Sequence, residues 1–222
     1  MSTYKVKVIS LKRRQDRREK MSHMFQHINF EFVDALDGKT YEMTEFDKEF
    51  VKGNDYEKWG VHIPSMVCAQ YMHLNLLEEC ANQELPYFIF EDDVLLNEDE
   101  KAPDLYFEAL ASVEDLDAFW FVPNEPSVAA YIVWPEGAKK MIDYVNNVTK
   151  LRRGLDWAFW DLRKNKEFRA DQANISYFIH NPGEDSDITT IENYVDVKIP
   201  RERVILGDIN TFLDDDEGFY RE

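Results

Sequence analysis

The sequence has 222 residues, of which 44% are hydrophobic and 14% aromatic, enough apolar material for a packed globular core. Its formal net charge of −18 argues against binding to a nucleic-acid backbone, because no broad basic surface is available to release counterions from phosphates. No Gly-, Ser- or Pro-rich linker interrupts the chain, so we expect one domain over residues 1–200 and an acidic C-terminal tail over 201–222.

The sequence carries no signal for export or membrane insertion. The N-terminus lacks a continuous apolar segment of the signal-peptide kind, and nowhere do about 18 apolar residues run together. Cys68 and Cys80 lie in one predicted helix, too far apart to form a disulfide there. We therefore expect a cytoplasmic protein with no transmembrane segment.

The first third of the chain predicts strand, helix, strand. Residues 4–11 alternate apolar and polar side chains before becoming apolar, which predicts a first strand. Residues 14–28 carry a helical apolar stripe, and residues 30–35 predict a second strand closed by an Asp37-Gly38 turn. The first strand leads directly into a basic stretch: Lys12, Arg13, Arg14, Arg17 and Arg18. These cations either contact an anionic ligand beside the sheet or form a solvated helix face.

Residues 39–64 are polar and aromatic without a clear period, as in many ligand-covering loops. Residues 65–82 then return to helical periodicity. His73 lies within this helix, where a single histidine is more often structural than catalytic.

The most informative stretch is a short apolar strand over residues 87–90 that ends in three adjacent acids, Glu91, Asp92 and Asp93. Like-charge repulsion and desolvation make such a cluster costly, and a divalent cation among the oxygens lowers both costs. The carboxyl ends of strands are also where open α/β sheets bind ligands. The pattern indicates either a metal site or an ordinary acidic turn.

The second half continues the alternation of elements. It predicts a helix that ends near residue 113, strands over 118–122 and 129–134, and a helix that begins at Pro135. Asp156 occupies an N-cap position in the sequence pattern, where its carboxylate accepts backbone N–H groups. A late strand over 175–179 ends at His180, a position that favours a ligand site.

Four segments, in this order and spacing, resemble glycosyltransferase family 25, which includes lipooligosaccharide and collagen galactosyltransferases. They are residues 8–18, 32–38, 90–94 and 129–141. The most specific is Glu91-Asp92-Asp93-Val94, which matches the family's version of the DxD metal motif. The family's Gly-Cys-x-x-Ser-His segment is altered here, with Val67 in place of Gly and with His73 one residue late. The chain therefore resembles a divergent member.

The resemblance implies a GT-A fold: an α/β domain whose twisted, mostly parallel central sheet is flanked by helices. It also implies a sugar nucleotide at the carboxyl ends of the first strands, and Mn²⁺ or Mg²⁺ that neutralises the diphosphate leaving group. Asp93 would be the principal metal ligand, joined by Glu91 and by His180, which resembles the metal-site histidine of lysyl hydroxylase glucosyltransferase domains. The residues expected to bind the nucleotide are Ser10, Leu11, Arg13, Arg14, Arg17, Asp34, Ala35, Glu91 and Asp92.

The function implied is transfer of a hexose from UDP-galactose or UDP-glucose to a glycan acceptor, with inversion. Asp156 is the expected general base, and Asp161, Glu184 and Asp185 are alternatives. Two other functions stay open: a carboxylate–metal phosphohydrolase, and a catalytically silent module that binds sugar nucleotides or partners.

Overall fold

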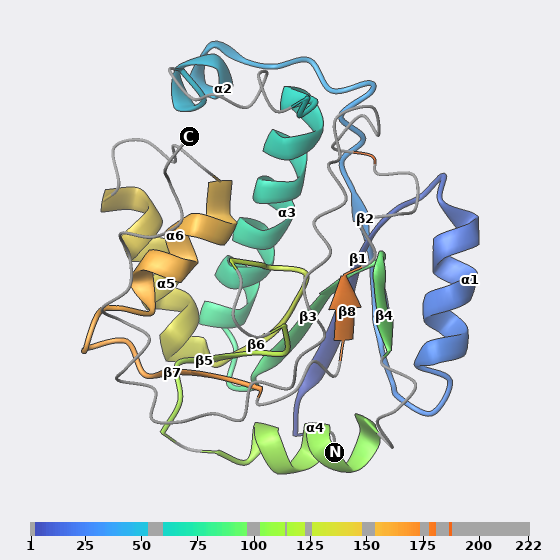
Figure 1. Cartoon of the computed structure of the whole chain (residues 1–222), viewed down its shortest axis with the longest axis vertical. Coiled ribbons are helices and arrows are strands. Elements are labelled where there is room, and N and C mark those ends of the chain that lie inside the picture. The colour runs from blue at the N-terminus through green and yellow to red at the C-terminus, as the bar shows by residue number, and fades with distance from the viewer. Residues whose placement is uncertain are drawn as a thin grey trace, which may run out of the picture.

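The computed structural model describes residues 3–52, 60–96, 103–113, 115–122, 126–147, 154–173, 178–180 and 187, and Figure 1 shows a central sheet with helices on both sides. The predicted tail over 201–222 lies outside the described residues. No helix of the described part is both long and apolar enough to cross a membrane.

The main sheet has six strands in the order β2-β1-β3-β6-β5-β7. The pairs β2–β1, β1–β3 and β5–β7 are parallel, whereas β6 runs antiparallel to both of its neighbours. The sheet is therefore mostly parallel, as expected. The strands are β1 (Lys5–Leu11), β2 (Glu31–Ala35), β3 (Tyr87–Glu91), β5 (Ala118–Trp120), β6 (Ala130–Val133) and β7 (Ala170–Gln172).

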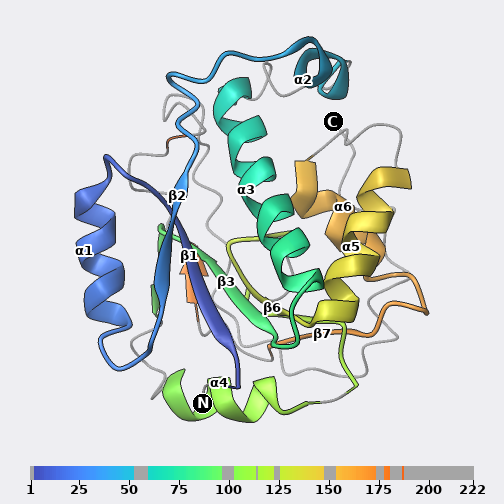
Figure 2. The same cartoon turned by 180° about the vertical axis from the view of Figure 1, so that it is seen from behind.

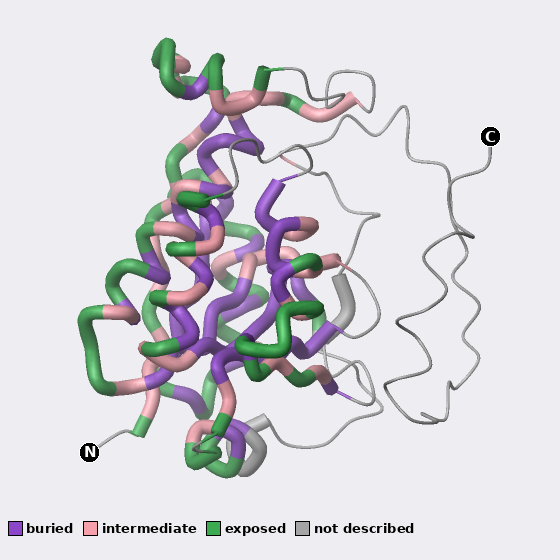
Figure 3. The backbone as a smooth tube through the Cα atoms, turned by 90° about the vertical axis from the view of Figure 1, so that its left-hand side faces the viewer, coloured by how far each residue is buried: buried purple, intermediate pink, exposed green. Residues whose placement is uncertain are grey.

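Strand β3 lies inside the sheet, between β1 and β6, and is buried on both faces. Tyr87 and Ile89 join one hydrophobic cluster, and Phe88 and Phe90 join the cluster on the other side. Side chains alternate between the faces of a strand, so a continuous apolar run is what a strand covered on both sides requires. Figure 3 shows this buried interior.

Two groups of helices cover the two faces (Figures 1 and 2). Apolar side chains of α3, α5 and α6 pack in the cluster that contains Tyr87, and those of α1 and α4 pack in the cluster that contains Phe88. The helices are α1 (Gln15–Met24), α3 (Ile63–Ala81), α4 (Pro103–Ala111), α5 (Pro135–Asn147) and α6 (Gly154–Leu162).

The aperiodic segment 39–64 contains a short helix that sequence periodicity does not indicate, α2 (Glu45–Phe50). Thr44 and Asp47 form a capping box at its start, with the Thr44 side chain accepting from Asp47 N and the Asp47 carboxylate accepting from Thr44 N. The fully buried Asp47 also accepts a hydrogen bond from Tyr71 of α3. The Asp47 carboxylate therefore connects the segment over residues 39–64 to α3.

A separate two-stranded sheet lies beside the main one. In it, β4 (Val94–Leu96) pairs antiparallel with β8 (Phe178–His180). Strand β4 begins directly after the acidic cluster, so this pairing brings the late strand of the chain to the carboxyl end of β3.

Candidate active site

The three acids lie at the carboxyl end of β3, next to the end of β1. Ser10 Oγ donates a hydrogen bond of 2.6 Å to Asp92 Oδ2, and Arg17 Nη1 of α1 donates one of 2.8 Å to Asp92 Oδ1. The same Arg17 nitrogen lies 3.8 Å from Asp93 Oδ2. Burial raises the pKa of Asp92, as does the charge of Asp93, while the bonds from Ser10 and Arg17 oppose this rise. The Arg17 guanidinium therefore pairs with Asp92 and Asp93 and does not belong to a solvated helix face.

Glu91 is held from the opposite side of the sheet. His73 Nε2 of α3 lies 3.1 Å from Glu91 Oε1, and its Nδ1 lies 3.2 Å from the hydroxyl of Tyr131. His73 is 1% exposed. Although His73 stands one residue late relative to the family pattern, its side chain contacts the first acid of the motif.

The sequence contains a signal that His73 is buried and needs a polar partner, although it does not identify that partner. Positions 66, 70, 73, 77 and 80 follow one face of α3 at spacings of four and three, and all five are buried. A histidine on that stripe is forced against the sheet, where a buried ring nitrogen requires a polar partner. Its partner, Glu91, is the acid that ends the neighbouring strand.

Asp156 lies near the same site, but it is not an N-cap. Helix α6 begins at Gly154, so Asp156 belongs to its first turn. Its Oδ1 accepts a 2.9 Å hydrogen bond from Val128 N, outside the helix. Burial raises the pKa of Tyr131, and the charges of Glu91 and Asp156 act in the same direction. Glu91 N donates a 2.8 Å hydrogen bond to the backbone oxygen of Ala129, the residue after Val128, so Asp156 lies near the carboxyl end of β3. Of the alternative bases, exposed Asp161 pairs with Lys164 at 3.5 Å, and Glu184 and Asp185 lie outside the described residues.

The residues expected to bind the nucleotide follow the ends of β1 and β2. The strand register sets Ser10 opposite Asp34 and Leu11 opposite Ala35. Arg18 Nη2 donates to Asp34 Oδ1 at 2.5 Å and to Ser10 O at 2.9 Å. The acidic and hydroxyl groups of two neighbouring parallel strands are thus brought to one edge of the sheet.

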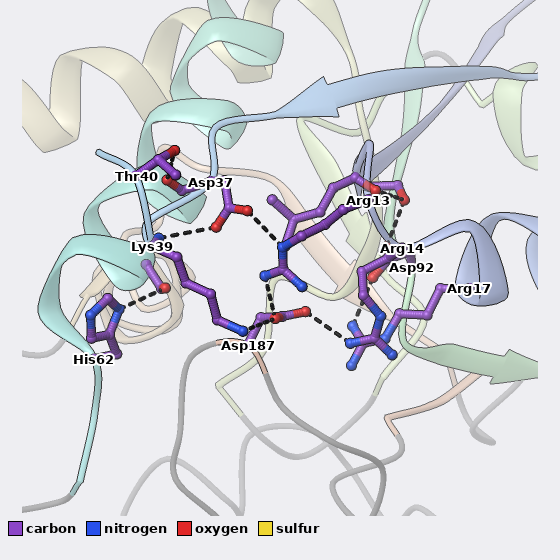
Figure 4. Close-up of polar contacts among 12 residues, drawn as sticks. Arg13, Arg14, Arg17, Asp37, Lys39, Thr40, His62, Asp92 and Asp187 are labelled. Atoms are coloured by element: carbon purple, nitrogen blue, oxygen red, sulfur yellow. Dashed lines mark hydrogen bonds and ion pairs between the residues drawn. The ribbon is translucent and has the colours of Figure 1, made fainter. Parts of the chain in front are cut away.

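Arg13 and Arg14 follow β1 and point to a different set of acids (Figure 4). Arg13 bonds to Asp37 and Asp187, each at 2.6 Å. Arg14 bonds to Asp16 and, at 2.9 Å, to Asp187. These two arginines form a basic group next to Asp92.

The expected metal ligands are only partly described. Strand register sets His180 opposite Val94, adjacent in sequence to Asp93, but the side chain of His180 is outside the described set. Within the described part of the chain, no three His, Cys, Asp or Glu side chains gather in an arrangement that could hold a metal ion. Carboxylate oxygens, such as those of Glu91 and Asp93, are donors that suit Mn²⁺ and Mg²⁺.

The fold and the polar groups at the strand ends define a class of protein. It is an α/β protein with carboxylates and arginines at the carboxyl ends of parallel strands. The sequence profile of glycosyltransferase family 25, described as LPS biosynthesis protein, matches residues 3–124. The chain therefore belongs to glycosyltransferase family 25, and the predicted α/β fold with a mostly parallel central sheet flanked by helices is confirmed.

A solved structure is also similar: the crystal structure of a glycosyltransferase involved in the glycosylation of the major capsid of PBCV-1. The TM-score is 0.48 and the identity 11%, over 84% of this chain and 95% of that chain. No curated protein sequence matches.

Proposed function

We propose that this protein transfers a hexose from UDP-galactose or UDP-glucose to a hydroxyl of a glycan acceptor, with inversion at the anomeric carbon. The observation that carries the proposal is the meeting of Asp92 and Asp93 with Ser10 and Arg17, directly after Glu91, at the ends of parallel strands. Membership of a glycosyltransferase family supports it independently.

In the proposed complex, the nucleotide lies over the ends of β1 and β2. Asp34, Ser10 and Asp92 supply acceptors for ribose hydroxyls, and Arg13 and Arg14 contact the diphosphate. Asp93, Glu91 and His180 would hold Mn²⁺ or Mg²⁺, which supplies positive charge beside the departing diphosphate. Two bonds already orient Asp92, so Asp93 is the better metal ligand of the two.

The chemistry is a single displacement. The acceptor oxygen attacks the anomeric carbon, the bond from that carbon to the diphosphate oxygen breaks, and its electron pair leaves with UDP. Asp156 takes the proton of the acceptor hydroxyl. The bond from Val128 N fixes the Asp156 carboxylate, and such a general base contributes roughly 10²–10⁴ in rate.

The first test is thermal stability with UDP, UDP-galactose, UDP-glucose and other nucleotides, each with and without Mn²⁺. A ligand at about a hundredfold excess over Kd adds about 2.7 kcal/mol of stability. We expect a rise with a UDP compound and Mn²⁺ together, and its loss in Asp93→Asn. The control is Asp115→Asn, which removes an exposed charge elsewhere.

Turnover is then measured as UDP release and as the mass of the glycosylated acceptor. Asp156→Asn should bind the donor normally and lose at least about a hundredfold in rate. If no nucleotide stabilises the protein with any divalent ion, the proposal fails. Metal-dependent UDP binding without transfer to any acceptor would instead indicate a silent binding module.

A further inference from the structure

Three cations from two separate loops meet at one carboxylate, that of Asp187 (Figure 4). Its Oδ1 accepts a 2.6 Å hydrogen bond from Arg13 Nη2 and lies 3.7 Å from Lys39 Nζ. Its Oδ2 accepts a 2.9 Å bond from Arg14 Nη1. The Asp187 side chain is 14% exposed, so the carboxylate is inserted among the cations and not merely close to them.

The cations come from loops whose backbone makes close contacts. Arg14 N donates to Leu11 O at 2.9 Å directly after β1, and Lys39 N donates to Asp37 Oδ1 at 3.0 Å after β2. Gly38 packs against the start of α3 so closely that an added Cβ would lie 2.3 Å from Ser65 Cα and Ser65 N. Neither loop can move far without disturbing a strand end or a helix, so the backbone that carries the cations is preorganised.

The composition of this group suits a phosphate better than a single carboxylate. Two guanidinium groups and an ammonium offer many N–H donors, and guanidinium forks match phosphate oxygens. Asp16 already pairs with Arg14, and Asp37 pairs with Arg13, whereas Asp187 bonds to both arginines. Burial would raise the pKa of Asp187, but the bonds from Arg13 and Arg14 lower it, so the carboxylate is ionised at neutral pH.

We propose that Arg13, Arg14 and Lys39 form a phosphate-binding site that the Asp187 carboxylate fills in the absence of ligand, so that a phosphate-bearing ligand binds by displacing Asp187. Where the proposed function holds, that ligand is the diphosphate of the donor. Asp187 then lowers donor affinity and competes with the nucleotide for the same cations. Arg17 is outside this site because it bonds to Asp92.

The test uses inorganic pyrophosphate as the probe, measured by calorimetry without metal, sugar or acceptor. Asp187→Asn preserves the shape of the side chain and removes the competing charge. We expect the Kd for pyrophosphate to fall about threefold to tenfold. Asp187→Ala should give the same change, and thermal melts of both variants verify that they are folded.

Asp16→Asn is the matched control. It removes the same charge from the same arginine, Arg14, but leaves Asp187 in place. We expect the Kd for pyrophosphate to change less than about twofold. An equal gain in both Asp→Asn variants would mean that net charge alone controls binding and would overturn the inference.

A second set of variants tests which cations produce the higher affinity for pyrophosphate in Asp187→Asn. Replacing Arg13 and Arg14 together by Gln in the Asp187→Asn background should abolish it, and Lys39→Gln should reduce it. The Kd for UDP should fall in Asp187→Asn as the Kd for pyrophosphate does, whereas the Kd for uridine should not change.

The outcomes separate this inference from the proposed function. If UDP binds with metal but neither UDP nor pyrophosphate responds to Asp187→Asn, the displacement is wrong while glycosyl transfer stands. If pyrophosphate responds but no sugar is transferred, the phosphate site stands on its own.

Discussion

His73 holds Glu91 through one ring nitrogen and contacts Tyr131 through the other, so it connects the core of the molecule to the acidic cluster. Residues that orient a metal ligand through a hydrogen bond are commonly worth 10- to 100-fold in affinity or activity. Because Glu91 is a ligand of the proposed metal, we expect His73→Phe to raise by about tenfold the Mn²⁺ concentration needed for half-maximal stabilisation by a UDP-sugar.

The control for this prediction is Tyr131→Phe, which removes the hydroxyl partner of His73 and leaves the contact to Glu91. We expect a shift of less than about threefold. If His73→Phe lowers the melting temperature and leaves the Mn²⁺ dependence unchanged, His73 acts through packing alone.

Asp117 is a fully buried carboxylate distant from the acidic cluster in sequence, and several donors surround it. Lys140 Nζ donates at 2.8 Å, Arg169 N at 2.7 Å and Arg169 Nη2 at 2.9 Å. Burial alone would raise the pKa of Asp117, but these donors lower it. A lowered folded-state pKa means stability that is present above the unfolded pKa and is lost as pH falls through the folded value.

We therefore expect Asp117→Asn to reduce the free energy of unfolding by about 3 kcal/mol at pH 7. The difference from the unmodified protein should shrink below about pH 4, where the unfolded carboxyl begins to bind a proton. Urea titrations at pH 7, 5 and 3.5 measure this difference in the free energy of unfolding. Asp115→Asn removes an exposed partner of the same Arg169 and should change stability by less than about 0.5 kcal/mol. A difference that is constant with pH would contradict the assignment.

At the scale of elements, the first turn of α5 meets the start of β5 at Gly137. A Cβ at this position would lie 1.8 Å from the backbone oxygen of Asp117, so only glycine allows this approach. We expect Gly137→Ala to destabilise the protein by about 2 kcal/mol through overpacking, although Ala is the better helix former. Thermal and urea unfolding test this against Glu136→Ala in the same turn, which should be near neutral because Glu136 is exposed. A stabilised Gly137→Ala variant would show that α5 can shift freely.

At the scale of the whole molecule, polar side chains from both faces of the sheet gather at the carboxyl ends of β1, β2 and β3. Arg17 and Arg18 at the start of α1 reach those ends from one side, and His73 of α3 reaches them from the other. The chain thus concentrates arginines at one edge while its net charge is −18. Cations gathered at one edge allow an acidic protein to bind a small phosphate-bearing ligand without attracting nucleic acid.

The sequence by itself determined the α/β class, most helices and strands, and the acidic end of β3. Periodicity and apolar runs are local properties, and they record which side chains each element buries. The resemblance of four sequence segments indicated the family, and the family profile that matches residues 3–124 confirms it.

Only the tertiary structure decided which groups meet. Val128 N is the partner of Asp156, Glu91 is that of His73, and Asp187 lies between Arg13 and Arg14. Each pair comes from different elements or loops, so its contact depends on strand order and helix packing. No spacing along the chain encodes these, because distances between elements are set by the packed sheet and not by the residues that separate them in sequence.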